Sequence, residues 1–506
     1  MSIKYRRIPL PGSFLLTILL TAEVLVLAYV QSPAERFMRY IAFDSGVDLT
    51  MQNLMARGFR PTIDFGCIYG LLPLLINRGW YGVAGLTPGA FRAEVILGTC
   101  LTAWGMARFA TALRVGPAGV ALIVLAMPDV LFPSYSTIVH VLEPALLVHG
   151  LAEQAKGRRG TALALATASC FVKPAMGYFY GLVLLISIGA ASKEQGRSYW
   201  LRSLAPAAIV GTALALMVAA VFGVAPMLEM LFPAKGAAVY RLGRYGFFHG
   251  VGSEFWALPG TGIWRYFRYE VGFWIIGSVW LVAGGMVALA RLVRGAATNL
   301  RAQDDEIVAC CAALHIVFVT CLFGQRMTWT YYFAILILGL AAMGKGSRTR
   351  VWITWFLVVL LLVNDRSKLL NTYREWSAGA PTAITLGLWA TPAERSEWRT
   401  VLELTEGQEP VLLSGVDASL PLTPRFAPPV AGYFCPGLTL PVEIRRKVDQ
   451  LSAARMIVTT LPSQGEGFDY WPELAAALDS CELIFEGGTF RVYRRIRPPS
   501  GQSRRP

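Results

Sequence analysis

The sequence has 506 residues, of which 55% are hydrophobic and only 15% are charged. Soluble domains carry about 25% charged residues, so this composition excludes an ordinary soluble protein and predicts a polytopic membrane protein. Much of the formal net charge of +14 lies in short loops between apolar runs, and no basic-aromatic module accompanies it. We therefore expect contact with membrane lipids and no binding to nucleic acid.

Apolar runs recur along most of the chain, and a run of about 20 residues is long enough to cross about 30 Å of hydrocarbon. The first run lacks the small-residue cleavage site of a signal peptide, so we predict that it is a membrane helix. The predicted helices cover residues 12–31, 89–112, 116–133, 137–154, 160–175, 177–192, 203–222, 271–291, 306–323, 329–343 and 350–364.

Basic residues predict how these helices are oriented. Cytoplasmic loops of membrane proteins are enriched in Lys and Arg, and alternate loops here contain such residues: Lys4, Arg6, Arg7, Arg114, Lys156, Arg158, Arg159, Lys193, Arg197, Arg291, Arg294, Arg301, Lys345, Arg348 and Arg350. Placing all of them in the cytoplasm predicts about eleven crossings, a cytoplasmic N-terminus and an extracytoplasmic C-terminus. The long loops 32–88 and 223–270 then lie outside. Their own arginines indicate either an anionic ligand or a salt-bridged surface.

The chain divides by composition into a transmembrane domain (1–365), a linker (366–391), a small extracytoplasmic α/β domain (392–497) and a disordered tail (498–506). In the α/β domain, "EPVLLSG" and "ARMIVTT" are short buried-strand patterns, and "CELIFEGGTFRVYRR" predicts a hairpin. "YWPELAAALDSC" predicts a helix between them. Cys435 and Cys481 could form a disulfide outside the cytoplasm, which the sequence does not decide.

The first outer loop contains "FDSGVDLTMQNLMARGFRPTIDFGCIYG", residues 43–70. Its apolar spacing predicts an amphipathic helix from Val47 to Gly58 that lies along the outer membrane interface. Asp48 is placed to cap this helix, and Asp64 to cap or close the turn after Pro61. Asp44 precedes any helix that it could cap. A carboxylate held against apolar protein has a raised pKa, which suits a general base.

Three other regions contain polar residues in apolar or aromatic surroundings. Lys173, in "CFVKPAMGYFYGLVLL", either faces a cavity or partner or snorkels to the interface. His249 and Glu254, in the second long loop, either face a pocket or belong to an interfacial aromatic belt. Arg326, in "GQRMTWTYYF", has the fork of donors that binds phosphate oxygens.

The order of motifs in the first loop resembles the GT-C superfamily of multipass glycosyltransferases, which includes protein O-mannosyltransferases and the aminoarabinose transferases of lipid A. In many bacterial members this loop reads roughly D-E-G, a helix, G-x-x-P-Y-x-D-F and Y-G-P. The matching segments here are Asp44-Ser45-Gly46, Gly58-Phe59-Arg60-Pro61, Asp64-Phe65 and Tyr69-Gly70-Leu71. Ser45 replaces the second acid and Leu71 replaces the proline. Lys173-Pro174 and Arg326 with the tyrosines after it resemble two further patterns more loosely.

The resemblance implies an all-α, GT-C-like polytopic membrane domain in a bacterial inner membrane. It implies a glycosyltransferase that moves a sugar from polyprenyl phosphate to a hydroxyl of a glycan, lipid or protein acceptor on the extracytoplasmic face. The reaction would invert the anomeric centre, with Asp44 as base and Asp48 as its substitute. The residues implied in binding substrate or phosphate are Arg57, Arg60, Asp64, Tyr69, Lys173, His249, Glu254 and Arg326. We expect no cofactor, although some members need a divalent metal.

Two other functions stay open. The main alternative is a non-enzymatic membrane transporter or lipid flippase, a class that often contains internal repeats and ionisable residues at mid-membrane. We find no internal repeat, and Glu23 is the clearest acid of that kind. Polar residues instead concentrate at one membrane face, which favours interfacial chemistry. Ser45 also leaves open a scaffold that has lost catalysis.

Overall fold

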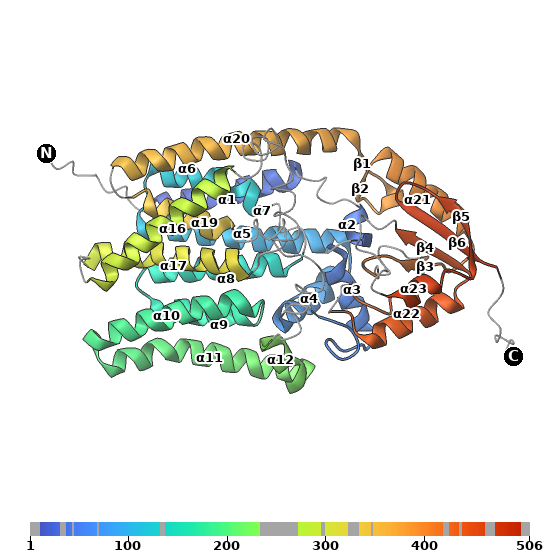
Figure 1. Cartoon of the computed structure of the whole chain (residues 1–506), viewed down its shortest axis with the longest axis horizontal. Helices are drawn as coiled ribbons and strands as arrows, with labels where there is room; N and C mark the ends of the chain where they lie inside the picture. The colour runs from blue at the N-terminus through green and yellow to red at the C-terminus, as the bar shows by residue number, and fades with distance from the viewer. Residues whose placement is uncertain are drawn as a thin grey trace.

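The computed structural model describes residues 11–30, 37–42, 45–67, 70–131, 137–232, 272–294, 299–321, 333–345, 348–417, 425–434, 438–460 and 471–496. Long helices lie side by side and form a bundle, and a small sheet lies beyond one end of it (Figure 1). Three short helices lie between the bundle and the sheet: α2 (Phe37–Ala42), α3 (Ser45–Ala56) and α4 (Leu71–Ala84). The first loop therefore separates the membrane domain from the C-terminal domain.

Each helix range predicted from the apolar runs overlaps a helix of the structure. In chain order these are α1 (Pro11–Val30), α5 (Pro88–Leu113), α6 (Pro117–Leu125) with α7 (Met127–Leu131), α8 (Val139–Ala155), α9 (Arg159–Cys170), α10 (Pro174–Gln195), α11 (Arg197–Phe222), α16 (Gly272–Val293), α17 (Asn299–Cys321), α19 (Phe333–Met343) and α20 (Arg348–Ala378). Pro88, Pro117 and Pro174 each begin a helix, where the missing N–H costs no hydrogen bond.

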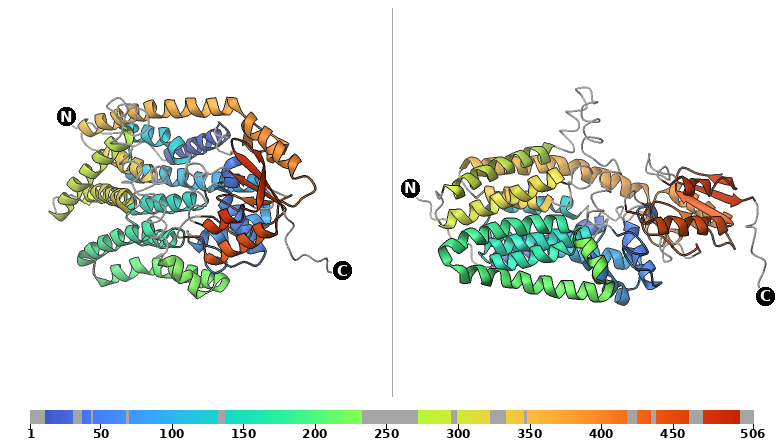
Figure 2. Two further views of the ribbon diagram at one scale, coloured as in Figure 1. Left: turned by 45° about the vertical axis from the view of Figure 1, so that its right-hand side comes forward. Right: turned by 60° about the horizontal axis from the view of Figure 1, so that its bottom comes forward.

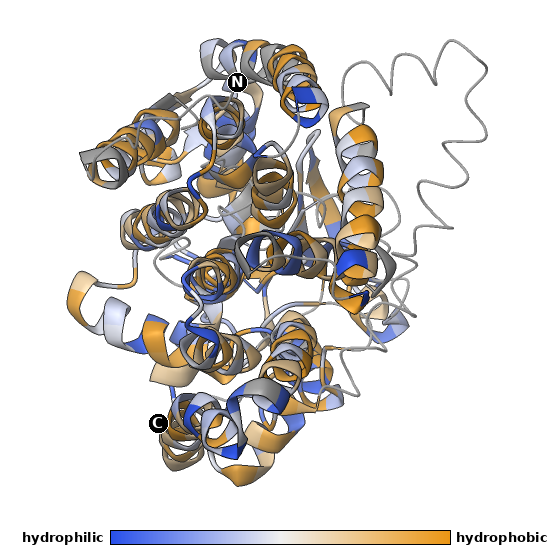
Figure 3. Cartoon of the chain, turned by 90° about the vertical axis from the view of Figure 1, so that its left-hand side faces the viewer, coloured by the Kyte–Doolittle hydropathy of each residue, from blue (hydrophilic) through white to orange (hydrophobic). Residues whose placement is uncertain are grey.

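Four helices among the described residues are long and apolar enough to cross a membrane: Pro88–Leu113, Met176–Lys193, Arg197–Phe222 and Ile276–Val293. Phe14–Tyr29 and Phe333–Met343 are apolar but shorter. On α11 only Ser203 and Val218 are buried, as expected where lipid covers the rest of a helix. Figure 3, viewed along the bundle, shows hydrophobic residues over the outer helices. The count of eleven crossings stays a prediction.

The first loop contains the predicted helix, although its surroundings differ from the prediction. It is α3, and Gly58, with φ of +87°, follows its end. Residues 45–54 are all buried, so the prediction that this helix lies on the membrane surface is wrong. Its apolar side packs in a cluster with residues of the first loop and α4, of the bundle, of α12 (Val224–Leu231) and of the C-terminal domain: Phe65, Leu71, Leu74, Phe171, Val218, Met230 and Val416. Its polar side also meets protein, since Gln52 Nε2 donates to the Leu74 carbonyl at 3.1 Å.

The C-terminal domain contains the predicted strands and hairpin in a four-stranded sheet of order β3-β4-β6-β5. Strand β4 is parallel to β3 and antiparallel to β6, which forms the hairpin with β5. Helix α20 and the β1–β2 pair occupy much of the predicted linker. In chain order the elements after α20 are β1 (Ala380–Pro381), η4 (Ala383–Thr385), β2 (Trp389–Ala390), α21 (Pro392–Leu404), β3 (Val411–Leu413), α22 (Pro441–Ala453), β4 (Met456–Thr460), α23 (Pro472–Ala476), β5 (Cys481–Glu486) and β6 (Phe490–Arg495). Cys481 is a free thiol in the structure, and Cys435 lies outside the described residues.

The hydrophobic core of the bundle continues into the C-terminal domain. One cluster of buried side chains contains residues of α1, α5 and α8 together with Trp398 of α21 and Phe490 of β6. Phe37 of α2 joins the two parts, because its ring meets the edge of Trp398 with centroids 4.9 Å apart. Figure 2 shows α2 to α4 in this intermediate position from two further directions. Burial of this apolar surface holds the domain against the loop.

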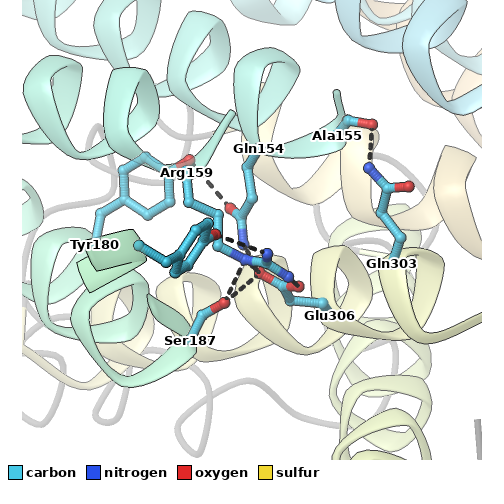
Figure 4. Close-up of polar contacts among 8 residues, drawn as sticks. Gln154, Ala155, Arg159, Tyr180, Ser187, Gln303 and Glu306 are labelled. Carbon is cyan, nitrogen blue, oxygen red and sulfur yellow. Dashed lines mark hydrogen bonds and ion pairs between the residues drawn. The ribbon is translucent and has the colours of Figure 1, made fainter. Parts of the chain in front are cut away.

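The opposite end of the bundle is held by ion pairs and hydrogen bonds around Glu306, near the start of α17 (Figure 4). Its carboxylate pairs with Arg159 at 2.6 Å and accepts hydrogen bonds from Ser187 at 2.6 Å and Gln154 at 2.9 Å. Tyr180 in turn donates to Gln154 at 3.1 Å. These contacts join the turn between α8 and α9 to α10 and α17. The end of the bundle where the predicted cytoplasmic turns meet is therefore tied together by charged groups.

Candidate active site

Asp48 lies in the first turn of α3 and is almost fully buried. Its Oδ2 accepts a hydrogen bond from the backbone N–H of Ile138 at 2.9 Å, and Ile138 is the residue directly before α8. The first N–H groups of a helix have no partner inside it, and a carboxylate there also meets the positive end of the helix dipole. Asp48 is therefore a capping residue of α8.

A second acid lies close to Asp48. Glu94 of α5 is buried and close enough to Asp48 for the two charges to interact. The side-chain amide of Asn77 on α4 is oriented so that its oxygen and its nitrogen both have suitable partners. In this orientation its nitrogen donates to Glu94 Oε1 at 2.8 Å and to the Pro73 carbonyl at 3.3 Å. The ring of Tyr81 lies in the same region, and burial is the main cause that raises the pKa of its hydroxyl. Two carboxylates are thus enclosed beneath the first loop.

Lys173 lies in the break between α9 and α10, directly before Pro174. Its backbone is extended, with φ of −151° and ψ of 104°, as expected for a residue that precedes proline. The side chain is buried and close enough to His140 of α8 for their charges to interact. His140 Nδ1 lies 3.2 Å from the hydroxyl of Thr137. The break therefore places a cation beside the start of α8, the helix end that Asp48 caps.

The first loop and the Lys173 break are joined through the backbone at Gly70. Gly70 N–H donates to the Val172 carbonyl at 2.8 Å, and Leu72 N–H donates to the Phe171 carbonyl at 3.2 Å. The free N–H groups at the start of α4 thus satisfy carbonyls after the end of α9. A Cβ at Gly70 would lie 1.9 Å from the Phe171 oxygen, so only glycine permits this approach. Two motifs separated by about a hundred residues of sequence therefore meet directly.

Arg57, Arg60 and Asp64 lie on the side of the loop that faces the C-terminal domain. Arg57 Nη1 donates to the Pro429 carbonyl. Arg60 pairs with Asp64 at 3.0 Å, and its backbone N–H donates to the same carboxylate oxygen at 2.8 Å. Desolvation raises the pKa of Asp64, but the hydrogen bonds and the charge of Arg60 outweigh it and hold this pKa below its ordinary value. Asp64 closes a turn here, one of the two roles that its position predicts.

The other predicted site residues are Asp44, Tyr69, His249, Glu254 and Arg326, and they lie outside the described residues. Asp44 directly precedes α3 in the sequence, and Tyr69 directly precedes Gly70. Their predicted roles stay predictions. Within the described ranges, no group of three His, Cys, Asp or Glu side chains is arranged to hold a metal ion. The question of a metal therefore stays open.

The sequence analysis missed Glu94, Asn77, Tyr81 and His140 of this cluster. The available signal was ionisable residues inside apolar runs, as in "FRAEVILGTC" and "TIVHVLEPALL". Such residues are costly in lipid, so they usually face a protein interior or a cavity. Only the fold shows that Asp48, Glu94 and Lys173 belong to one region, at the end of the bundle nearest the C-terminal domain.

No protein-family model matches the sequence, and no curated protein matches it. Among solved structures, the chain is similar to ArnT. Two crystal structures of ArnT from Cupriavidus metallidurans match, one bound to undecaprenyl phosphate and one in the apo state. The identities are 14% and 15%, and the TM-score is 0.47 for both. The matches cover 96% and 94% of this chain, and 98% and 97% of the ArnT chains.

ArnT is an aminoarabinose transferase of the GT-C superfamily. The first-loop motifs of this chain resemble that superfamily, to which both similar solved structures belong. Similarity to ArnT at this identity and TM-score assigns neither an activity nor a site to this chain.

Proposed function

We propose that the protein is a membrane glycosyltransferase that moves a sugar from a polyprenyl-phosphate donor to an acceptor hydroxyl on the extracytoplasmic face. The observation that carries this proposal is the junction at Gly70. It brings the first-loop motif against the Lys173 break, next to the helix end that Asp48 caps. Buried acids and a buried cation at one end of a lipid-facing bundle suit a substrate with a lipid tail and a charged head group.

In the proposed reaction, the carboxylate of Asp44 accepts the proton of the acceptor hydroxyl. The acceptor oxygen then attacks the anomeric carbon from the face opposite the phosphate. The new bond from that carbon to the acceptor oxygen forms while the bond to the phosphate oxygen breaks, and polyprenyl phosphate leaves with both electrons. The configuration at the anomeric carbon inverts. Groups that bind the phosphate more strongly as its charge develops lower the barrier.

Lys173 is the described residue best placed for that task. It is buried at the start of α10, where free backbone N–H groups and the helix dipole also favour an anion. In the proposal, Lys173 and Arg326 bind the phosphate, the polyprenyl tail lies between helices, and the sugar lies beneath the first loop. Asp48 and the Arg60–Asp64 turn hold the loop in place around it. A metal is not required in this scheme.

Two variants of the full-length enzyme test the proposal, with mass spectrometry of the lipid that co-purifies in detergent. Asp44→Asn removes the base, so transfer should fall by about 10²-fold or more while the donor stays bound and is trapped. Lys173→Met removes a charge-assisted contact, so donor affinity should fall by about 10- to 100-fold. Lys193→Met is the matched control, because Lys193 is exposed in the last turn of the same helix. Full transfer by Asp44→Asn would remove the assigned base.

The transporter or flippase alternative predicts a different result. Purified protein in sealed vesicles would move a polyprenyl-phosphate lipid between leaflets without forming a glycosylated product. Retention of the complete donor pool after incubation with acceptor, together with movement across the bilayer, would favour that alternative.

A further inference from the structure

The carboxylate of Glu443 joins the C-terminal domain to the first loop. Glu443 lies in the first turn of α22 and is fully buried. Its Oε2 accepts hydrogen bonds from the N–H groups of Gly66 and Leu440, both at 2.8 Å, and its Oε1 accepts one from Gly432 at 2.8 Å. Gly66 belongs to the first loop, 377 residues earlier in the chain. One side chain thus satisfies three backbone donors from two parts of the molecule.

The loop backbone packs directly against the domain at this point. A Cβ on Gly66 would lie 2.3 Å from the Leu438 carbonyl oxygen, so no side chain separates the two backbone segments. Arg446, one turn after Glu443 on α22, donates to the Asp64 carbonyl. Its guanidinium also lies over the ring of Phe59, 4.6 Å from the centroid. Glu443 is therefore the buried centre of an interface that has Arg446 at its edge.

Gly66 is four residues before Gly70, whose N–H donates to the carbonyl of Val172 beside Lys173. We propose that Glu443 is a positioning residue that, by holding Gly66, sets the position of the Gly70–Lys173 junction and with it the phosphate side of the site. This inference rests on the proposed function. It assigns the C-terminal domain a part in binding the lipid donor, through the first loop and without contact to the substrate.

The test measures the affinity of the full-length protein in detergent for undecaprenyl phosphate, the lipid without a sugar. Glu443→Ala should raise the Kd by about tenfold, because unpaired buried N–H groups release the loop. Hydrogen exchange of the peptide 57–70 should become faster in the same variant. Glu443→Gln should bind more tightly than Glu443→Ala, because an amide oxygen at the Oε2 position still accepts from Gly66 and Leu440, although its NH2 group then faces the Gly432 N–H.

Glu397→Ala is the matched control. The carboxylate of Glu397 accepts hydrogen bonds from Gly488 at 2.9 Å, Thr489 at 2.8 Å and Phe490 at 3.3 Å, all within the C-terminal domain. Glu397→Ala therefore removes as many hydrogen bonds to backbone N–H groups as Glu443→Ala does. The Kd of Glu397→Ala for undecaprenyl phosphate should stay at the wild-type value. If Glu443 had a purely structural role, Glu443→Ala would reduce the fraction of protein that can bind the lipid. The Kd of the protein that still binds would not change.

Two results would overturn the inference. One is an unchanged Kd in folded Glu443→Ala protein. The other is an equal rise of the Kd in Glu397→Ala. If Glu443→Ala does not fold, Glu443→Asp shortens the side chain by one methylene and withdraws the carboxylate from Gly66, and an unchanged Kd in that variant has the same meaning. Wild-type protein that does not bind undecaprenyl phosphate would instead contradict the proposed function, so the two failures are distinguishable.

Discussion

Asp48 shows how a single acid can have a structural role that its sequence position does not predict. Its place at the start of a helix predicts a cap for that helix. In the structure its carboxylate accepts from Ile138 at the start of α8, 90 residues away along the chain. The two helices are thereby joined at the end of the bundle nearest the C-terminal domain. The interaction is a cap, as predicted, but its partner depends on how α3 and α8 meet.

This contact separates a structural role of Asp48 from a catalytic one. Asp48→Ala should lower the free energy of unfolding by about 1–3 kcal/mol, because the buried Ile138 N–H loses its acceptor. Asp48→Asn keeps an oxygen in place, so it should lose less than half of that and retain most of the transfer activity. Urea titration with pulse proteolysis measures the first quantity, and a transfer assay the second. A loss of transfer in Asp48→Asn as large as that in Asp44→Asn would instead make Asp48 the base.

Asp64 should make the first loop sensitive to acid only. Its pKa is held below the ordinary value, so the folded state binds this proton less readily than the unfolded state. The stabilisation is then complete above the unfolded pKa of about 3.9 and is lost as the pH falls through the lower folded value. Hydrogen exchange of the peptide 57–67, corrected for intrinsic rates, should change little between pH 8 and about pH 5 and rise at more acid pH. Asp64→Asn should remove the acid-induced rise, and a steep change near neutral pH would contradict the assignment.

At the scale of elements, α3 marks the limit of reasoning from periodicity. Its residues Val47, Met51 and Leu54 form the apolar stripe that predicts a half-buried helix. The structure buries the polar residues as well, because the bundle and α4 supply partners such as the Leu74 carbonyl for Gln52. The sequence does not distinguish a polar side chain that is hydrogen-bonded inside the protein from one that is exposed to water. The helix itself was predictable, and its full burial was not.

The junction of α4 with the Lys173 break offers a test at this scale. Gly70→Ala would place a Cβ 1.9 Å from the Phe171 oxygen, so the loop must move away from the break. We expect a loss of about 1–3 kcal/mol in the free energy of unfolding and weaker binding of undecaprenyl phosphate. Gly79→Ala, on the same helix with no atom near its added Cβ, should be neutral or stabilising by up to about 1 kcal/mol. Equal effects of the two substitutions would show that the junction is not a constrained contact.

At the scale of the whole molecule, the acidic segment 304–306 of α17 pairs with basic residues from several other helices and turns. Glu306 pairs with Arg159, Asp305 with Arg291 at 3.3 Å and Asp304 with Lys345 at 2.9 Å. The orientation rule predicts that all three of these cations are cytoplasmic. In the structure they belong to the start of α9, the end of α16 and the turn after α19, and these helix ends lie away from the sheet (Figure 1). A single set of helix ends therefore agrees with the predicted cytoplasmic face.

The orientation of the chain is directly testable. Proteinase K added to spheroplasts should digest the domain that contains residues 392–497, and inside-out vesicles should protect it. The reason is that the basic turns hold the other end of the bundle in the cytoplasm. A periplasmic and a cytoplasmic marker protein report the integrity of the two preparations. Protection of the domain in spheroplasts would place Asp44 and Lys173 on the cytoplasmic side and contradict the proposed function.

The sequence by itself determined the ranges of the long apolar helices, the strands of the C-terminal domain and the first-loop motif, because apolar runs, alternation and turn residues are local properties of the chain. The tertiary structure alone decided that Gly70 meets the Lys173 break, that Glu94 lies near Asp48 and that Gly66 donates to Glu443. These contacts join backbone and side-chain groups that are tens to hundreds of residues apart. A hydrogen bond depends on distance and direction in space, and local sequence patterns specify neither for partners so far apart.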